Sequence, residues 1–245
     1  MTRAAARRFY EPPLASIDWK RSVRVVPSRF PPVGVFDRVA DPADLDDVFA
    51  VEALTNDRLR DEAGDIRLVP LGERVSGPGT TPIMAAFTHP NREGSRFSDG
   101  SFGVYYAAND LDTALAESRY HRERFLAYSS EAPMRIGMRA YYARIRAELH
   151  DLRGLGAVHG WKSRAEDVFD PDPERYGAGQ SLARELRSRG SGGLVYPSVR
   201  RPGGSCVGIF RPKLVAPVTQ GPHFDFVWDG HTVTDVLKVQ RYSGL

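Results

Sequence analysis

The stretch Tyr106-Ala-Ala-Asn-Asp-Leu-Asp-Thr-Ala-Leu-Ala-Glu117 decides the fold of this chain, because it predicts a strand that leads directly into a helix. Upstream, Phe102, Val104 and Tyr106 alternate with other residues at the period of two that is typical of a strand. The pair Asn109-Asp110 then supplies side chains that favour the N-cap of a helix. We therefore expect the strand to end near residue 108 and the helix to begin at Leu111.

Glu117 falls in the second turn of this predicted helix, on the face of Thr113 and one turn before His121. A tyrosine from the strand and a carboxylate from the helix, directed to one place, would build a small-molecule cleft. The same residues fit a core tyrosine and a helix with a solvated glutamate, which is the commoner arrangement. The residues of this stretch alone leave both interpretations open.

The composition favours one large globular domain, with 245 residues of which 41% are hydrophobic. Lys and Arg number 34 against 31 Asp and Glu, and the resulting charge of +3 is scattered along the chain. A nucleic-acid interface would require a concentrated basic face, so we expect no direct nucleic-acid partner.

Cellular location is indicated by cysteine usage and hydropathy. The single Cys206 excludes an internal disulfide and is consistent with a reducing compartment. No apolar run approaches the roughly 18 residues of a membrane helix. The basic start of the chain lacks the apolar stretch of a secretion signal. We expect a cytoplasmic protein without a membrane partner.

Prolines and glycines divide the chain. Residues 1–32 contain Pro12, Pro13, Pro27, Pro31 and Pro32, which predict an N-terminal arm with at most a short helix over 17–26. Residues 33–245 are expected to form one domain, with extra structure around 41–90. Within it we predict a strand over 33–39, a helix over 41–61 and a short strand over 66–71.

The second half of the chain predicts a mainly antiparallel α+β domain. Apolar–polar alternation favours strands over 134–145 and 147–152, and 155–170 reads as irregular. A helix over 176–189 precedes buried strands at 194–196 and 206–210. The final segment is expected to be a hairpin around the turn Asp229-Gly230.

Several well-known catalytic signatures are absent from the sequence. It has no Gly-x-Gly-x-x-Gly between a strand and a helix, and no phosphate-loop Gly-Lys-Ser/Thr. Its histidines never pair at ligand spacing, and one cysteine does not build a zinc site. The stretch Gly203-Gly-Ser-Cys-Val207 lacks the final glycine of a nucleophile elbow. We expect no resident metal.

Two separated blocks carry a family resemblance. The first runs from Gly94 to Glu117 and contains a Gly-x-Arg-aromatic step, a tyrosine near the end of a strand and Ala-x-x-Glu. The second is Gly193-Leu-Val-Tyr-Pro-Ser-Val-Arg200, followed by the turn at Trp228-Asp229-Gly230. In this order they resemble the RES domain family, which is named for an arginine, a glutamate and a serine. The resemblance covers roughly residues 30–240.

The resemblance implies an ADP-ribosyltransferase-like fold, with split antiparallel β-sheets, flanking helices and a central cleft for NAD. It also implies a toxin of a toxin–antitoxin pair that depletes NAD by hydrolysis or phosphorolysis. An alternative is an ADP-ribosyltransferase that modifies a cellular protein such as a nucleotide-precursor synthetase. The acceptor (water, phosphate or protein) stays open, because the donor site would look the same.

The resemblance assigns catalytic roles to Glu117, Ser198, Arg38 and Tyr106. A carboxylate at Glu117 would stabilise the oxocarbenium-like ribose that forms when nicotinamide leaves. Ser198 would bond the ribose or orient Glu117, and Tyr106 would bound the ribose or stack on nicotinamide. Arg38 would hold pyrophosphate, although Asp37 precedes it where the family has an aromatic residue; pairing with an acid is the alternative.

Binding roles are expected for Arg96, Tyr105, Arg200 and His89. Arg96 suits the pyrophosphate and Tyr105 the nicotinamide ring. Arg200 would pair with a phosphate or with an acid. His89 lies in the polar loop 88–100, where a structural role is the commoner one for a lone histidine.

The expected partner of such a toxin is an Xre-like antitoxin that covers the cleft, and a target protein would be a second partner if the chain is a transferase. A catalytically inactive relative that acts only by binding is a further alternative. The presence of both Glu117 and Ser198 disfavours it.

Overall fold

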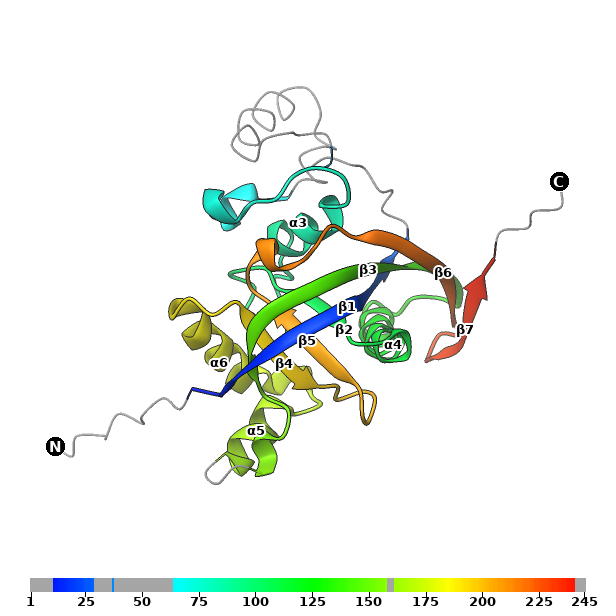
Figure 1. Ribbon diagram of the computed structural model, residues 1–245. Helices are drawn as coiled ribbons and strands as arrows, with labels where there is room; N and C mark the ends of the chain where they lie inside the picture. Colours follow the sequence, from blue (N-terminus) through cyan, green and yellow to red (C-terminus); the bar gives the residue numbers. More distant parts are fainter. Residues whose placement is uncertain (1–10, 29–36, 38–63, 158–160, 241–245) are drawn as a thin grey trace.

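The computed structural model describes residues 11–28, 37, 64–157 and 161–240 (Figure 1). Arg38, the predicted helix over 41–61 and all of the predicted strand over 33–39 except residue 37 lie outside these described residues.

The described strands form one seven-stranded sheet in the order β1-β2-β5-β4-β3-β6-β7. Their bounds are β1 (Leu14–Pro27), β2 (Tyr105–Ala108), β3 (Met134–Asp151), β4 (Gly193–Pro197), β5 (Ser205–Ile209), β6 (Thr219–Trp228) and β7 (Val233–Val239). The helices are α3 (Thr81–Thr88), α4 (Leu111–Tyr128), α5 (Lys162–Val168) and α6 (Gly177–Ser188). Short 3-10 turns are η2 (Ile66–Leu68), η3 (Leu71–Glu73), η4 (Leu155–Ala157), η5 (Pro173–Arg175) and η6 (Pro212–Leu214).

The sheet consists of two antiparallel parts that meet only locally. One part is β1-β3-β6-β7, in which β1 pairs with β3 from Leu14 opposite His150 to Pro27 opposite Met138. The other part is β2-β5-β4. The parts join through Val23 opposite Ala108 and through a short parallel contact between β3 and β4. The expected α+β fold with split, mainly antiparallel sheets is confirmed.

The two faces of β2-β5-β4 pack into different hydrophobic clusters, because alternate residues of a strand point to opposite faces. Tyr105 and Ala107 belong to one cluster with residues of α3, including Met84. Val104 and Ala108 belong to the other, with residues of α4, α5 and α6. A residue on β2 therefore reaches either the α3 side or the α4 side.

The prediction of an N-terminal arm is wrong for residues 14–27. This segment is strand β1, and its pairing with β3 makes it part of the domain. The prolines that suggested an arm do not interrupt it: Pro12 and Pro13 precede the strand and Pro27 is its last residue. A proline at the end of a strand costs no ladder hydrogen bond inside it.

Most other predicted elements of the described chain are present. The two strands predicted over 134–145 and 147–152 are one continuous strand, β3. The helix over 176–189 and the hairpin at Asp229-Gly230 correspond to α6 and the β6–β7 turn. The predicted strand over 66–71 is wrong, since η2 and η3 occupy this segment. The segment predicted to be irregular over 155–170 contains α5.

Candidate active site

The first turn of α4 is built as the sequence predicts. Asn109 exchanges two hydrogen bonds with Ser205 of β5, one through its backbone N–H (2.9 Å) and one through Oδ1 (3.0 Å). Asp110 is the N-cap, and its Oδ1 accepts from the backbone N–H of Thr113 at 2.8 Å. The start of the helix is thus anchored to the sheet, and Glu117 follows one turn after Thr113.

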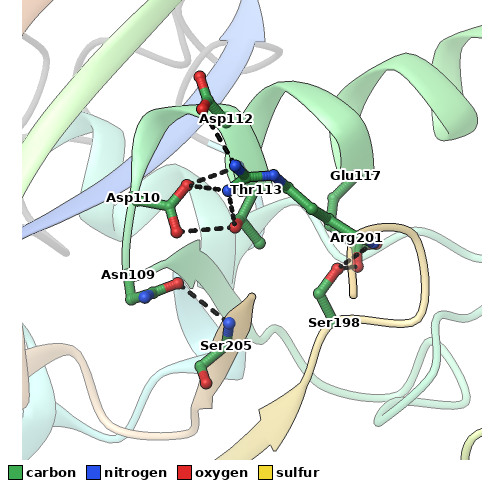
Figure 2. A network of polar contacts seen from close by, with 8 residues as sticks. All are labelled: Asn109, Asp110, Asp112, Thr113, Glu117, Ser198, Arg201 and Ser205. Atoms are coloured by element: carbon green, nitrogen blue, oxygen red, sulfur yellow. Dashed lines mark hydrogen bonds and ion pairs between the residues drawn. The ribbon is translucent and has the colours of Figure 1, made fainter. Parts of the chain in front are cut away.

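Glu117 and Ser198 meet directly, although they come from different elements (Figure 2). The Ser198 hydroxyl donates to Glu117 Oε1 at 2.6 Å. Ser198 Oγ itself accepts from the backbone N–H groups of Arg200 (3.2 Å) and Arg201 (3.0 Å). A serine hydroxyl has one donor and two acceptor positions, so all three are used. Ser198 therefore orients the carboxylate and has no lone pair free to attack a substrate.

The loop that carries Ser198 is compact and lies against α4. Ser198 N–H donates to Gly204 O at 2.9 Å, and Gly204 N–H donates to Arg201 O at 3.0 Å. A Cβ atom at Gly204 would lie 2.5 Å from Thr113 Oγ1. Only glycine allows this approach of the loop to the helix.

Tyr106 lies on the α4 side of β2. Its hydroxyl lies 2.8 Å from Ser95 Oγ and accepts from the backbone N–H of Phe97 at 3.0 Å. Burial raises the pKa of Tyr106 to about 12, so the phenol stays neutral. Tyr106 is half-buried and packs against the core cluster of the α4 side.

Tyr105 is separated from this site. It is 1% exposed and packs in the cluster on the α3 side of the sheet. The alternation of strand β2 sends its ring away from that of Tyr106. A stacking role for Tyr105 beside Glu117 is therefore not supported.

Tyr196 of β4 joins the site instead, and sequence analysis missed it. Burial raises its pKa well above the ordinary value, and the charges of Cys206, Glu117 and Tyr106 act on it as well. Its position two residues before Ser198 was the signal that could have identified it. The neighbouring Cys206 thiol is buried, and burial and then Glu117 raise its pKa, so it is an inert group.

Arg96 is committed to the protein backbone. Its Nη1 donates to the carbonyl oxygens of Val168 (2.8 Å) and Asp170 (2.9 Å), and its guanidinium lies 4.3 Å from the centre of the Tyr176 ring. The residue is 8% exposed. This geometry favours a structural role over the pyrophosphate role that the sequence suggested.

Arg200 lies beside the site and stacks on α4. Its guanidinium is 3.3 Å from the centre of the Tyr120 ring, and its Nη2 donates to Pro171 O at 2.5 Å. Tyr120 Oη also donates to Pro171 O, at 3.3 Å. The sequence-based alternative of an acid partner finds no support among the described residues, because none of their carboxylates forms an ion pair with Arg200.

His121 lies on α4 one turn after Glu117. The residue is exposed, although many protein atoms lie around its imidazole, and the charges of Arg200, Arg96, Arg122 and Arg124 act on it. Burial, and then the charges of Arg200 and Arg96, lower its pKa to about 4. The imidazole is therefore neutral at physiological pH.

The remaining candidates lie elsewhere. His89 follows the C-terminus of α3, where its Nδ1 lies 3.0 Å from Thr88 Oγ1. Arg38 lies outside the described residues; its neighbour Asp37 accepts hydrogen bonds from the backbone N–H groups of Gly79, Thr80 and Thr81 at the start of α3.

Arg24 of β1 is an arginine that sequence analysis did not single out. Its Nη1 donates to the backbone carbonyl of Tyr106 at 3.0 Å, and its guanidinium lies 5.1 Å from the centre of the Tyr105 ring. Burial lowers its pKa. No carboxylate of the described residues forms an ion pair with it, so it is a candidate to bind an anion.

A cavity of about 510 Å³ lies apart from the Glu117–Ser198 pair. It is lined by apolar residues such as Phe87, Phe102 and Phe210, and by Glu73 and Arg211, which form an ion pair. None of the residues around Glu117 contributes to it, so we do not assign the chemistry to this cavity.

Among the described residues, no group of three or more His, Cys, Asp or Glu side chains is arranged to hold a metal ion. No helix of the described chain has the length and apolar character needed to cross a membrane.

Comparison with known proteins places these residues in a family. The family model described as "RES domain" matches residues 73–229, which include Tyr106, Glu117 and Ser198. The uncharacterized protein y4oC of Sinorhizobium fredii (strain NBRC 101917 / NGR234) is 29% identical over 212 residues, which are 86% of this chain and 84% of that protein. A solved structure, the M. tuberculosis MbcT–MbcA toxin–antitoxin complex, aligns with 11% identity and a TM-score of 0.44 over 86% of each chain. Because the family model matches more than half of this chain, the chain belongs to the RES domain family.

Proposed function

We propose that this protein binds NAD and cleaves its nicotinamide–ribose bond, and that it acts as a toxin by depleting cellular NAD. The observation that carries the proposal is the Glu117 carboxylate, which Ser198 orients at 2.6 Å. Tyr196 lies near enough to Glu117 for the carboxylate to act on its pKa, and Tyr106 packs in the same hydrophobic cluster as Tyr196.

The chemistry requires a carboxylate and little else. Nicotinamide leaves as a neutral ring, so no acid is needed to protonate it. Positive charge develops on the ribose, and a preorganised carboxylate stabilises it without reorganisation. Of the two carboxylate oxygens of Glu117, Oε1 accepts a hydrogen bond from a described residue. We propose that Oε2 faces a ribose carbon or hydroxyl.

Anion binding is the second requirement, because NAD carries a pyrophosphate. Arginine forks match phosphate oxygens well. Arg200 is the candidate that lies beside the site, since no described carboxylate pairs with it. Arg24 also lacks such a partner, but its guanidinium lies against the Tyr105 ring, which packs on the α3 side. Arg38 stays a candidate on the family resemblance alone, and Arg96 is the weakest because two backbone carbonyls hold it.

Transfer of ADP-ribose to a protein is the alternative within enzymes, and an inactive binding partner is the alternative outside them. No feature of the described site favours either one over NAD depletion. Whichever acceptor is used, an enzyme that consumes NAD harms its own cell, so we propose a cognate Xre-like antitoxin that blocks access to the site.

The deciding experiment incubates the purified protein with NAD in three arms: buffer alone, added phosphate, and a cell lysate. Mass spectrometry of the products distinguishes free ADP-ribose, its phosphate ester and ADP-ribosylated protein. Glu117→Gln is the control in each arm. Unchanged NAD in all arms with folded wild-type protein would reject NAD consumption.

The toxin role has a separate test. The chain is expressed alone, as wild type and as Glu117→Gln, in a host without the antitoxin. We expect growth arrest and low NAD with the wild type only. Equal growth with both soluble proteins and unchanged NAD would contradict the proposal.

A further inference from the structure

We propose that Arg201 is a positioning residue that locks the Ser198 loop onto the first turn of α4 and thereby orients Ser198 toward Glu117. The inference rests on the proposed function for its kinetic readout. Figure 2 shows the Arg201 side chain reaching from the loop back to the helix that carries Glu117.

The Arg201 guanidinium bridges three acceptors of this first turn. Nη1 donates to Asp110 Oδ1 at 2.9 Å and to Thr113 Oγ1 at 3.2 Å. Nη2 donates to Asp112 Oδ2 at 3.1 Å. The backbone N–H of Arg201 donates to Ser198 Oγ at 3.0 Å. One residue thus contacts both the hydroxyl that orients Glu117 and the helix on which Glu117 lies.

The Arg201 contacts fix the orientation of the Ser198 loop relative to α4 as well as its distance from the helix. Glu117 is separated from Ser198 by 81 positions in the chain, and residues 198–204 lie between β4 and β5. A planar guanidinium with several acceptors resists rotation, whereas a lysine ammonium would act as a point charge. The loop therefore keeps one orientation relative to the helix.

The position of Arg201 is not explained by helix stability. The N-terminus of a helix carries a partial positive charge, which disfavours a cation there. Asp110 and Asp112 offset that cost by pairing with Arg201 at 2.9 and 3.1 Å. A direct role in binding pyrophosphate is also disfavoured, because both hydrogens of Nη1 are used within the protein.

The experiment compares Arg201→Ala and Arg201→Lys with the control Arg144→Ala. Arg144 makes a similar two-point pair with Asp18, at 2.9 Å for each contact, on exposed side chains outside the site. For Arg201→Ala we expect kcat for NAD consumption to fall by roughly tenfold or more, the scale of a small misplacement. KM should stay within about twofold, and Arg201→Lys should lie between the wild type and Arg201→Ala.

A double-mutant comparison identifies the route of the effect. If Arg201 acts through Ser198, then Arg201→Ala should cost nothing further in a Ser198→Ala background. A full additional loss in that background would overturn the proposal. So would an unchanged kcat, a rise in KM alone, or an equal loss in Arg144→Ala.

A readout independent of NAD separates this inference from the proposed function. Hydrogen exchange of the amides of Arg200 and Arg201, which bond Ser198, should accelerate in Arg201→Ala and not in Arg144→Ala. If the wild type does not consume NAD, accelerated exchange still supports the positioning role. Unchanged exchange would overturn it in either case.

Discussion

The Ser198 hydroxyl donates a 2.6 Å hydrogen bond to Glu117 Oε1, and two backbone N–H groups hold the serine oxygen from the other side. The donor position and both acceptor positions of the serine hydroxyl are thereby occupied. A carboxylate that is oriented before substrate arrives needs no reorganisation when positive charge forms on a sugar.

Replacing Glu117 with Gln should lower kcat for NAD by about 10²–10³-fold, the scale of losing one electrostatic stabiliser. Gln is nearly isosteric and can still accept from Ser198, so the melting temperature should not change. Steady-state kinetics and thermal unfolding of the same preparations test this. Near wild-type turnover with an unchanged melting curve would remove Glu117 from the mechanism.

Ser198→Ala should lower kcat by roughly tenfold, because Glu117 loses its donor and two N–H groups lose their acceptor. Ser198→Thr keeps the hydroxyl and should lose less. If Ser198 instead bonds the ribose in the ground state, KM would rise while kcat stays constant. The two patterns are separated by full kinetic curves rather than by single rates.

Arg96→Ala should destabilise the fold. A buried acceptor that loses its partner costs about 1–3 kcal/mol, and Arg96 satisfies one buried carbonyl (Val168) and one part-buried carbonyl (Asp170) that should cost less, so we expect a loss of about 2–4 kcal/mol. The control Arg175→Ala removes a surface pair with Asp170 in the same region and should cost below about 0.5 kcal/mol. Denaturant unfolding measures both. Full stability together with a raised KM would instead favour the pyrophosphate role.

His121 should make stability depend on pH between about 6.5 and 4. Its folded-state pKa of about 4 lies below the ordinary 6.5, so the unfolded chain binds the proton first as pH falls. The free energy of unfolding should therefore decrease through this window, by a small amount because the side chain is exposed and solvent screens its charge. The carboxylates with lowered pKa values, such as Asp229 and Asp18, contribute mainly below it. The melting temperature of His121→Gln should fall less between pH 7 and 5 than that of the wild type; an equal fall would exclude this residue as the cause.

Removal of divalent metals should leave NAD consumption unchanged, because a carboxylate alone stabilises the developing ribose cation in the proposed reaction. The measurement is turnover after dialysis against a chelator, compared with a sample to which zinc or magnesium is restored. Loss in the chelator and recovery with metal would contradict this mechanism.

The sequence by itself determined the features that depend on neighbours in the chain. The Asn109-Asp110 cap, the start of α4, the Asp229-Gly230 hairpin and the α+β class follow from local hydrogen bonding and from the period of two or 3.6 residues. The pairing of Glu117 with Ser198 could be predicted from the sequence because the two motifs resemble those of one family.

Tertiary structure decided what depends on partners far along the chain. The sequence predicted an arm where the structure has strand β1, because the pairing of β1 with β3 is a long-range contact. The sequence also suggested that Arg96 binds a ligand, whereas its guanidinium donates to the backbone carbonyls of Val168 and Asp170. Tyr105 and Tyr106 are adjacent in sequence, yet the strand directs them into different clusters. The reason is physical: a residue type states which contacts a side chain is able to make, and burial decides which of those contacts are formed.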